Sequence, residues 1–189
     1  AQFLEIVHSN NELLQQLIAD ILDLSKIEAG TLEFTFSEVD VNQLMFDIEQ
    51  LFRMRLEDKS AVIQIIRQTP PDECVMYTDR NRLQQVVSNF MTNAVKFTDE
   101  GSITFGYNRC AEGLYFYVKD TGSGIPEDKV NHIFERFVRV EQNKKGTGLG
   151  LAICEMIIRK LGGKIGVESE YGKGSTFWFT LPINGRQIK

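Results

Sequence analysis

Polar side chains recur along one predicted helix, residues 80–97, in a pattern that suits phosphate chemistry. Asn89, Asn93 and Lys96 follow the spacing i, i+4, i+7, which puts them on one helical face. Amide oxygens are hard ligands of the kind that Mg²⁺ takes, and a lysine ammonium is a point charge for phosphate. The row therefore indicates a metal and phosphate site. An ordinary solvated helix face is the alternative interpretation.

Two glycine clusters, "DTGSGIP" and "GTGLGLA", indicate where the backbone could approach a flat ring or a phosphate. Gly146, Gly148 and Gly150 directly precede a predicted helix, and amide N–H groups at such a position bind anions. The dinucleotide motif GxGxxG is excluded, because Leu151 stands where its third glycine is needed. The later stretch "EYGKGST" likewise lacks the spacing of a P-loop. Phosphate is the expected ligand of the second cluster, and common glycine turns are the alternative.

The elements around these residues predict an α/β protein with a mixed, mostly antiparallel sheet under a layer of helices. Asp79 is the expected N-cap of the helix 80–97. Helices are also predicted at 1–28, 41–59 and 150–163. Strands are predicted at 31–40, 61–68, 74–78, 101–110, 113–120, 164–170 and 175–183. The apolar side of the helix 80–97 is Leu83, Val86, Val87, Phe90, Met91, Ala94 and Val95.

The first helix carries a heptad seam that is wider than a pair of helices needs, which predicts a helical bundle. Gly30 follows the last residues of this periodic pattern and is read as the point where the helix stops. The seam consists of Phe3, Val7, Asn10, Leu14, Leu17, Ile21 and Leu24, and it is widened by Ile6, Leu13, Ile18 and Leu22.

Composition excludes several classes of protein. The 189 residues carry a net charge of −5 and the sequence pI is about 5.2, which argues against a broad nucleic-acid surface. Three scattered cysteines without a CxxC pair indicate reduced thiols in a cytosolic setting and no metal site, and packing as small core residues is the favoured role for them. No apolar run approaches the roughly 20 residues of a membrane span. The chain begins without Met and inside the helical pattern, so we expect a fragment of a longer protein.

Five motifs together resemble those of a known family. The stretches "NFMTNAVKFT", "DTGSGIP", "FERF", "GTGLGLA" and "GKGSTFWFTLP" occur in the order of the N, G1, F, G2 and final glycine boxes of sensor histidine kinases of two-component systems. The resemblance implies a two-layer α/β sandwich of the type shared with gyrases and certain chaperones. It divides the chain into a partial dimerisation and phosphotransfer helix, residues 1–30, and a catalytic ATP-binding domain, residues 31–189.

The resemblance also implies roles for individual residues. Asp120 would accept the adenine amine, and Asn93 would bind Mg²⁺ with Asn89 beside it. Lys96 would reach the phosphates, and Arg136 and Arg139 would act on the γ-phosphate. Phe134 and Phe137 would anchor the lid, with core packing as the alternative. Further ATP contacts are implied for Phe97, Gly122, Gly124, Ile125, Gly146, Thr147, Gly148, Leu149, Gly150, Leu151 and Thr176.

Asn89 bears on the reaction. In the hydrolysing relatives a glutamate stands at this position and activates water, whereas an amide has no useful basicity. Transfer of the phosphoryl group to a histidine is therefore favoured. The family's acceptor stretch, similar to "SHEIRTP", does not occur in this chain. His8 is read as a surface or bundle-edge residue, and His132 as a helix residue near the lid.

Two other functions remain open, an ATP hydrolase of the same superfamily and a non-catalytic nucleotide-binding module. The expected ligands are ATP or ADP and Mg²⁺. The expected partners are a second copy, joined through the N-terminal helix, and the receiver domain of a response regulator. Nucleic acid is not expected. We expect a cytoplasmic location, with any membrane anchor in absent parts of the parent protein.

Overall fold

The structure, a computed structural model, describes residues 2–56, 62–141, 144 and 146–183. In the first helix the side chains of residues 2–6, 8, 9 and 12 lie outside the description, so the predictions for Phe3, Ile6 and His8 do too. The helices are α1 (Gln2–Glu28), α2 (Val41–Arg55), α3 (Arg80–Phe97), α4 (Glu127–Val130) and α5 (Gly150–Lys160). The strands are β1 (Ser37–Asp40), β2 (Ile63–Gln68), β3 (Val75–Thr78), β4 (Gly101–Cys110), β5 (Gly113–Asp120), β6 (Lys164–Glu170) and β7 (Gly174–Leu181).

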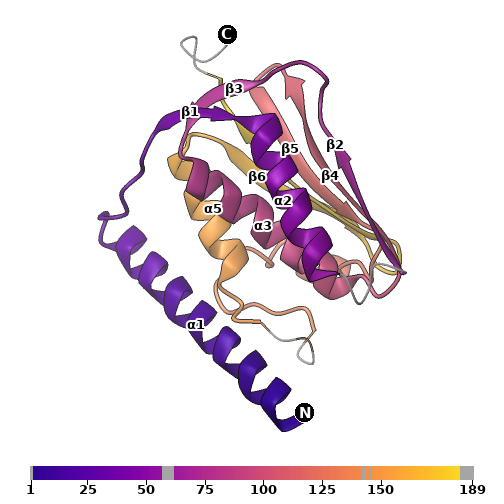
Figure 1. The fold of residues 1–189 in the computed structure, drawn as a ribbon. Coiled ribbons are helices and arrows are strands. Elements are labelled where there is room, and N and C mark those ends of the chain that lie inside the picture. Colours follow the sequence, from indigo (N-terminus) through magenta and orange to yellow (C-terminus); the bar gives the residue numbers. More distant parts are fainter. Residues whose placement is uncertain (1, 57–61, 142–143, 145, 184–189) are drawn as a thin grey trace.

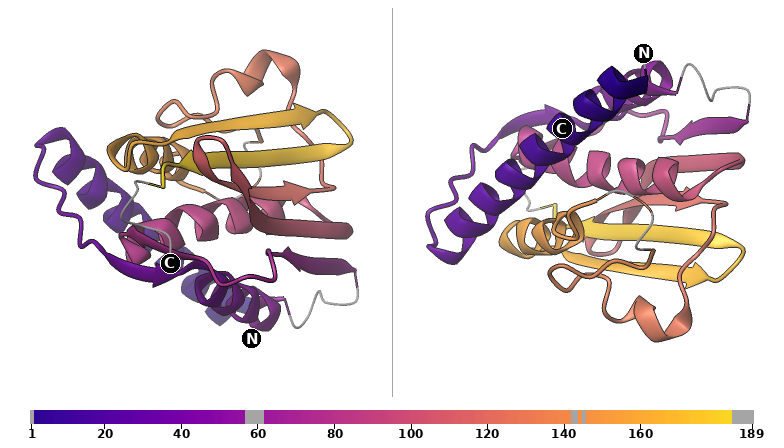
Figure 2. Two further views of the ribbon diagram at one scale, coloured as in Figure 1. Left: turned by 90° about the horizontal axis from the view of Figure 1, so that it is seen from above. Right: turned by 90° about the horizontal axis from the view of Figure 1, so that it is seen from below.

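Five strands form the main sheet in the order β2-β4-β5-β7-β6. Only the β2–β4 pair is parallel within this sheet, and β1 pairs with β3 in a separate two-stranded sheet. Helices α2, α3 and α5 lie together on one face of the main sheet (Figures 1 and 2). The predicted two-layer sandwich with a mostly antiparallel sheet is therefore confirmed.

Helix α3 is fixed by its apolar side and by its start. Asp79 accepts a hydrogen bond from the backbone N–H of Arg82 at 3.0 Å, as expected of an N-cap. The ring of Phe90 packs against Phe177 and Phe179 of β7, with centroid distances of 5.3 and 6.0 Å. Six of the seven predicted apolar residues are buried, and Val95 is partly buried. The opposite, polar side of the helix is thereby held in one orientation.

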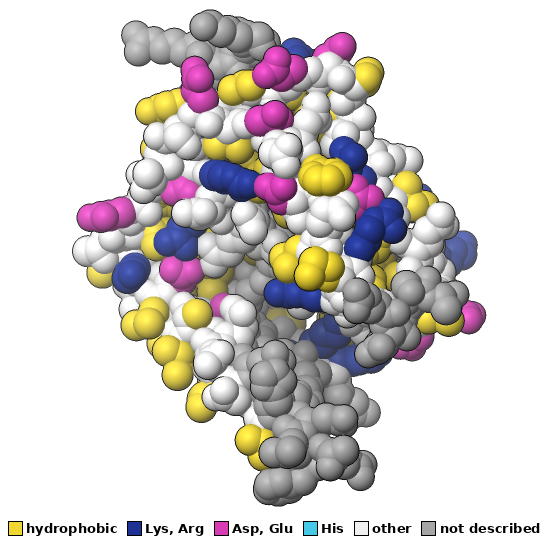
Figure 3. Space-filling view, viewed as in Figure 1, with side chains coloured by type: hydrophobic (Ala, Val, Ile, Leu, Met, Phe, Trp, Pro, Cys, Tyr) yellow, Lys and Arg dark blue, Asp and Glu magenta, His cyan; other side chains and the backbone are white. Residues whose placement is uncertain are grey.

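Helix α1 packs against this body with one side only. Leu17, Leu24 and Ile27 lie against the core, and polar contacts described below add to them. The side chains that point away are Val7, Leu14, Ile18, Ile21 and Leu22, each between 46% and 55% exposed. Hydrophobic side chains line the outer edge of the helix in Figure 3. Within the described part of the chain, no helix is both long enough and apolar enough to cross a membrane.

The connection after α1 differs from the prediction. A strand was expected over residues 31–40, but β1 contains only Ser37–Asp40. The physical reason is that the backbone N–H of Thr35 donates to a side chain, the Asp79 carboxylate, at 2.8 Å and not to a neighbouring strand. Gly30 adopts φ +67 directly after α1, which is consistent with its predicted role as a stop.

Candidate functional site

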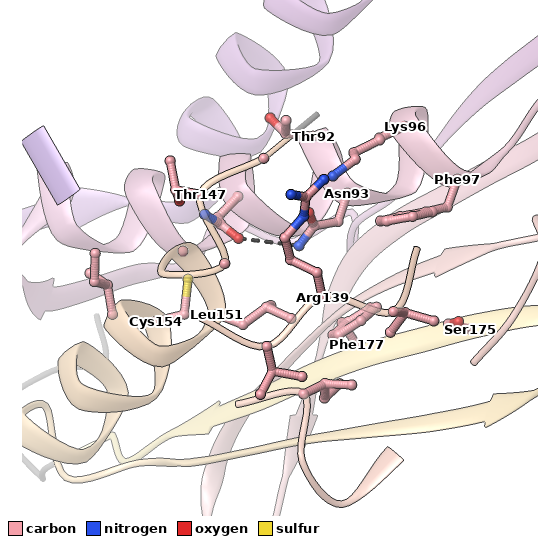
Figure 4. A pocket seen from close by; sticks show the side chains of 18 of the residues that line it. Thr92, Asn93, Lys96, Phe97, Arg139, Thr147, Leu151, Cys154, Ser175 and Phe177 are labelled. Carbon is pink, nitrogen blue, oxygen red and sulfur yellow. Dashed lines mark hydrogen bonds between the residues drawn. The ribbon is translucent and has the colours of Figure 1, made fainter. Parts of the chain in front are cut away.

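A cavity of about 470 Å³ lies where α3, the start of α5, the end of β5 and the helix α1 meet (Figure 4). A cavity of this volume is in the range of small-molecule sites. Predicted site residues that line it are Asn89, Asn93, Lys96, Phe97, Asp120, Gly124, Ile125, Arg139, Gly146, Thr147, Gly148, Gly150 and Leu151. Residues from four separate stretches of sequence therefore converge on one space.

The polar row of α3 faces this cavity. Asn93 donates from Nδ2 to Oδ1 of Asn89 at 3.3 Å, and this bond does not use the amide oxygen of Asn93. The ammonium of Lys96 lies 4.8 Å from the centroid of the Phe97 ring. Burial lowers the pKa of Lys96 from its ordinary value, and the positive charge of Arg139 lowers it further. An anion that entered the cavity would therefore stabilise the charged form of Lys96.

Asp120, the last residue of β5, is only 5% exposed. Its Oδ1 accepts hydrogen bonds from the backbone N–H groups of Gly122 at 2.8 Å and Ser175 at 3.3 Å. Burial raises the pKa of Asp120, and these two N–H groups oppose that rise. Both bonds go to the same oxygen, so neither engages Oδ2. The second oxygen is the natural acceptor for a ligand's N–H.

The predicted residue Thr176 lies in β7, one position from a residue that lines the cavity. Ser175 and Phe177 line the cavity, whereas Thr176 is not among the lining residues. Side chains alternate between the two faces of a strand, so neighbours of Ser175 point to the sheet's other face. Sequence reasoning also missed Phe177. It lies two positions after Ser175 in "STFWF", so the alternation of the strand puts both side chains on the same face.

Two further predicted residues support the cavity from outside. Gly122 does not line it; a Cβ there would lie 2.2 Å from the carbonyl oxygen of Phe97. Leu149 is fully buried in the core. Gly124 does line it and adopts φ +66, and a Cβ would lie 2.2 Å from the Glu170 oxygen. The close approach of backbone to backbone explains these two glycines.

The glycine loop, residues 146–150, passes directly over the polar row of α3. A Cβ on Gly146 would lie 2.8 Å from Nζ of Lys96, and one on Gly150 would lie 2.2 Å from Nδ2 of Asn89. Helix α5 begins at Gly150, so its first N–H groups adjoin the cavity. This arrangement is typical of an anion site, because the N-terminal end of a helix favours negative charge.

The two predicted arginines have different surroundings. Arg139 lines the cavity and donates from Nη2 to the carbonyl oxygen of Lys144 at 2.6 Å. Arg136 is not a lining residue and forms an ion pair with Glu28 at the end of α1. The structure therefore brings only Arg139 to the cavity.

The aromatic residues of "FERF" also differ. Phe134 packs against the core, while Phe137 is 67% exposed and has φ +63, which is costly for a residue with a Cβ. The backbone N–H of Phe137 donates to the carbonyl oxygen of Gly148 at 2.8 Å. The backbone of this residue thereby supports the glycine loop. His132 lies on the surface, with Nδ1 2.6 Å from a Glu135 oxygen.

Helix α1 supplies lining residues that no motif indicated, namely Leu13, Gln16 and Asp20. Asp20 is 4% exposed and accepts a hydrogen bond from Thr147 of the glycine loop at 2.7 Å. The two residues are 127 positions apart in the sequence. Periodicity marked α1 by its heptad seam, so a polar residue outside the seam that faces the cavity carried no recognisable signal.

The donor set fits a magnesium nucleotide. The glycine loop leaves space that a Cβ would fill, beside a lysine and two amides. Among the described residues, no group of three or more His, Cys, Asp or Glu is placed to hold a metal ion. Mg²⁺ does not need such a cage, because it keeps waters and shares its ligands with phosphate oxygens.

Known proteins are similar to this chain in sequence and fold. The family described as histidine kinase-, DNA gyrase B-, and HSP90-like ATPase matches residues 78–185. The sensor histidine kinase RcsC of Escherichia coli K12 is 37% identical over 96% of this chain and 19% of its own length. Full-length ShkA, in complex with AMPPNP, has a TM-score of 0.84 and 31% identity over 100% of this chain and 39% of its own.

A third relative is the histidine kinase ThkA in complex with the response regulator TrrA. It has a TM-score of 0.77 and 26% identity, and the match covers 97% of this chain and 51% of that one. The chain thus spans about half or less of each of these proteins. Sequence match, fold and cavity agree, and the chain belongs to the histidine kinase-, DNA gyrase B- and HSP90-like ATPase family.

Proposed function

We propose that this chain is the catalytic part of a sensor histidine kinase, which binds Mg-ATP and transfers its γ-phosphoryl group to a histidine on another helix. The observation that carries this proposal is the cavity itself. It joins a buried carboxylate, Asp120, to Asn93, Lys96 and the glycine loop. The likeness to ShkA, whose structure contains AMPPNP, supports the same ligand.

Adenine would lie at Asp120, where Oδ2 accepts from the exocyclic amine. Guanine presents an oxygen at that position and would leave the buried carboxylate unpaired, which costs about 1–3 kcal/mol. At the other end, the glycine loop and the first N–H groups of α5 would surround the phosphates, with Lys96 and Arg139 as cations. We place the metal at Asn93, with Asn89 beside it; bound Mg²⁺ would neutralise phosphate charge and orient the phosphoryl group.

In the transfer step an imidazole nitrogen of the acceptor would attack the γ-phosphorus. A P–N bond forms, the P–O bond to the β-phosphate breaks, ADP leaves and the imidazole gives up a proton. The residues of this chain position the phosphates and supply charge. Asn89 favours this reaction over hydrolysis, because an amide cannot activate water as a general base.

The remaining assignments extend from this proposal. Residues 1–30 would be the second helix of a dimerisation and phosphotransfer hairpin, and residues 31–189 the ATP-binding domain. The exposed apolar side of α1 would contact the missing hairpin helix and a second copy. The likeness to ThkA, solved with a response regulator, supports a receiver domain as the final acceptor. We place the protein in the cytoplasm, where its nucleotide is found.

The test supplies the missing acceptor. The chain is incubated with γ-labelled ATP, Mg²⁺ and a separate protein that carries the family's first hairpin helix with its histidine. We expect acid-labile, base-stable label on that protein and little on the chain itself. Asn93→Ala should reduce the transfer strongly while metal-free ADP binding is retained, and Asn81→Ala, on the exposed start of the same helix, serves as the control.

Other outcomes distinguish the alternatives. Rapid release of inorganic phosphate without label on the acceptor would indicate a hydrolase. Nucleotide binding without transfer or hydrolysis would indicate a binding module. Equal affinity for ATP and GTP would contradict the role of Asp120.

A further inference from the structure

Helix α1 is held against the catalytic body by acidic side chains on one side. Asp20, Asp23 and Glu28 each contact a different part of that body. Asp23 forms an ion pair with Arg82 of α3 at 3.1 Å, and Glu28 forms one with Arg136. The contacts of Asp23 and Glu28 are thus ordinary attractions between opposite charges. Figures 1 and 2 show α1 lying across the ends of α3 and α5.

Asp20 is different: its hydrogen-bond partners among the described residues are Gln16 and Thr147, and neither carries a charge. Its Oδ1 accepts from Gln16 at 2.7 Å and its Oδ2 accepts from the hydroxyl of Thr147 at 2.7 Å. With 4% exposure the carboxylate has lost almost all of its hydration. A buried carboxylate without a cationic partner is stabilised weakly, and a further negative charge nearby would oppose it.

The contact reaches the glycine loop through one hydroxyl. Thr147 donates to Asp20 and at the same time accepts from the backbone N–H of Leu149 at 3.2 Å. Asp20 therefore orients the residue that ties the loop to the start of α5. The carboxylate of Asp20 also lies close to Cys154 of α5. Burial raises the pKa of that thiol, and the charge of Asp20 adds to the rise.

Asp20 lines the same cavity as Lys96 and the glycines. If that cavity holds the phosphates, as the proposed function requires, a buried negative charge stands on the wall that the phosphates approach. With Mg²⁺ bound, ATP still carries one more negative charge than ADP. Like charges repel more strongly in a partly dehydrated site than in water, so ATP should oppose the docked Asp20 more than ADP does.

We propose that Asp20 and Thr147 form a nucleotide-sensitive latch, which holds α1 on the catalytic body and is weakened by ATP more than by ADP. Coupling between two sites is reciprocal: if ATP weakens the docking of α1, the docking of α1 weakens ATP binding by the same factor. The latch would keep α1 docked after turnover and favour its release when ATP enters. Asp20 is a positioning residue in this scheme, because it acts through Thr147 and its own charge.

The experiment measures α1 docking and nucleotide affinity in the full chain. Hydrogen exchange over residues 13–24 reports docking with no nucleotide, with Mg-ADP and with Mg-AMPPNP. In the unaltered protein we expect protection to be lower with AMPPNP than with ADP. Calorimetry on Asp20→Asn should show AMPPNP affinity raised about tenfold relative to the change in ADP affinity, and the two nucleotides should now protect α1 equally.

Asp23→Asn is the matched control. It makes the same change of charge on the same helix and removes the ion pair to Arg82, but Asp23 is not a lining residue. We expect it to lower the protection of α1 in every state and to keep the difference between ADP and AMPPNP. A general loosening of the helix is thereby separated from the specific effect of charge in the cavity.

Three results would overturn the proposal. The first is equal protection of α1 with the two nucleotides in the unaltered protein. The second is an Asp20→Asn variant whose ratio of AMPPNP to ADP affinity is unchanged, or matches that of Asp23→Asn. The third is failure of both nucleotides to bind any variant, which would overturn the proposed function as well. Binding with an unchanged ratio would overturn the latch alone.

Discussion

The two walls of the cavity are built in different ways. One wall is α3, a regular helix that begins at a side-chain cap and buries six apolar residues under the sheet. The other wall consists of Val138–Glu141 and the glycine loop, and both Gly148 and Phe137, which directly precedes this wall, have positive φ. We call them the helix wall and the loop wall. The helix wall carries the amides and the lysine, whereas the loop wall carries backbone N–H groups.

What holds the loop wall is a set of single polar contacts with other segments. Glu141 accepts from Ser123 at 3.2 Å, and the carbonyl oxygen of Val140 accepts from Lys129 at 3.0 Å. Thr147 contacts Asp20. Each such hydrogen bond contributes about 0.5–1.5 kcal/mol net, so phosphate oxygens can replace one of them at little cost. The helix wall thus holds its polar side chains in fixed positions, whereas the loop wall is held by hydrogen bonds that a phosphate group can replace.

The largest expected effect comes from breaking the helix wall. Phe90 is fully buried and its ring contacts two aromatic rings of β7. Phe90→Ala should lower the free energy of unfolding by about 3–5 kcal/mol, because it removes apolar contacts and leaves a cavity. Denaturant titration measures this loss. Asn81→Ala at the exposed start of the same helix should change stability by less than about 0.5 kcal/mol; similar losses for both variants would mean that α3 is not anchored in this way.

A smaller effect is expected in the loop wall. Gly148 has φ +73, and a Cβ would lie 2.9 Å from Cα of Phe137. Gly148→Ala should cost about 1–2 kcal/mol of stability through its backbone conformation, and it should also weaken ADP binding by distorting the loop. Thermal unfolding and calorimetry measure the two effects.

Gly172 offers a matched control, since it has φ +83 with nothing within 4 Å of its missing Cβ. Gly172→Ala should show a similar loss of stability with unchanged ADP affinity. If both variants bind ADP equally well, the loop wall does not contact the nucleotide.

The smallest effect concerns the charge of Lys96, which lies on the helix wall and faces the loop wall. The pKa of Lys96 is lowered by burial and by Arg139, so the folded protein releases this proton at a lower pH than an exposed lysine would. A bound phosphate favours the charged form. We therefore expect ADP binding to take up protons on the alkaline side and its affinity to decline as pH rises towards the lowered pKa.

Calorimetry in two buffers of different ionisation enthalpy measures the proton uptake. Lys96→Arg should abolish it, because a guanidinium stays charged throughout this range. Equal uptake in the variant would assign the proton to another group.

Much of this architecture could be predicted from the sequence, because most of its helices and strands carry strong local patterns. The spacing of Leu83 to Ala94 and the cap at Asp79 identified α3, and they placed Asn89, Asn93 and Lys96 on its other side. Strands with clear alternation were located for the same reason. These predictions depend on neighbours in sequence, which periodicity can report.

Predictions that depended on tertiary contacts fared less well. Thr176 was assigned to the cavity although the alternation in β7 presents Ser175. Arg136 was grouped with Arg139, but an ion pair with Glu28 holds it elsewhere. Asp20 was missed because its role depends on a hydrogen bond with Thr147, which is 127 positions away in the sequence. Such contacts leave no periodic trace in a single sequence.

The strand order has a consequence for how the protein is made. The last of the described strands, β7, lies inside the sheet, between β5 and β6. Until β7 pairs with them, β5 and β6 each present an open strand edge, and open edges are sites where chains can associate wrongly. Ser175, which holds the Asp120 carboxylate, arrives with that final strand. The second hydrogen bond to the Asp120 carboxylate therefore forms only once β7 has inserted between β5 and β6.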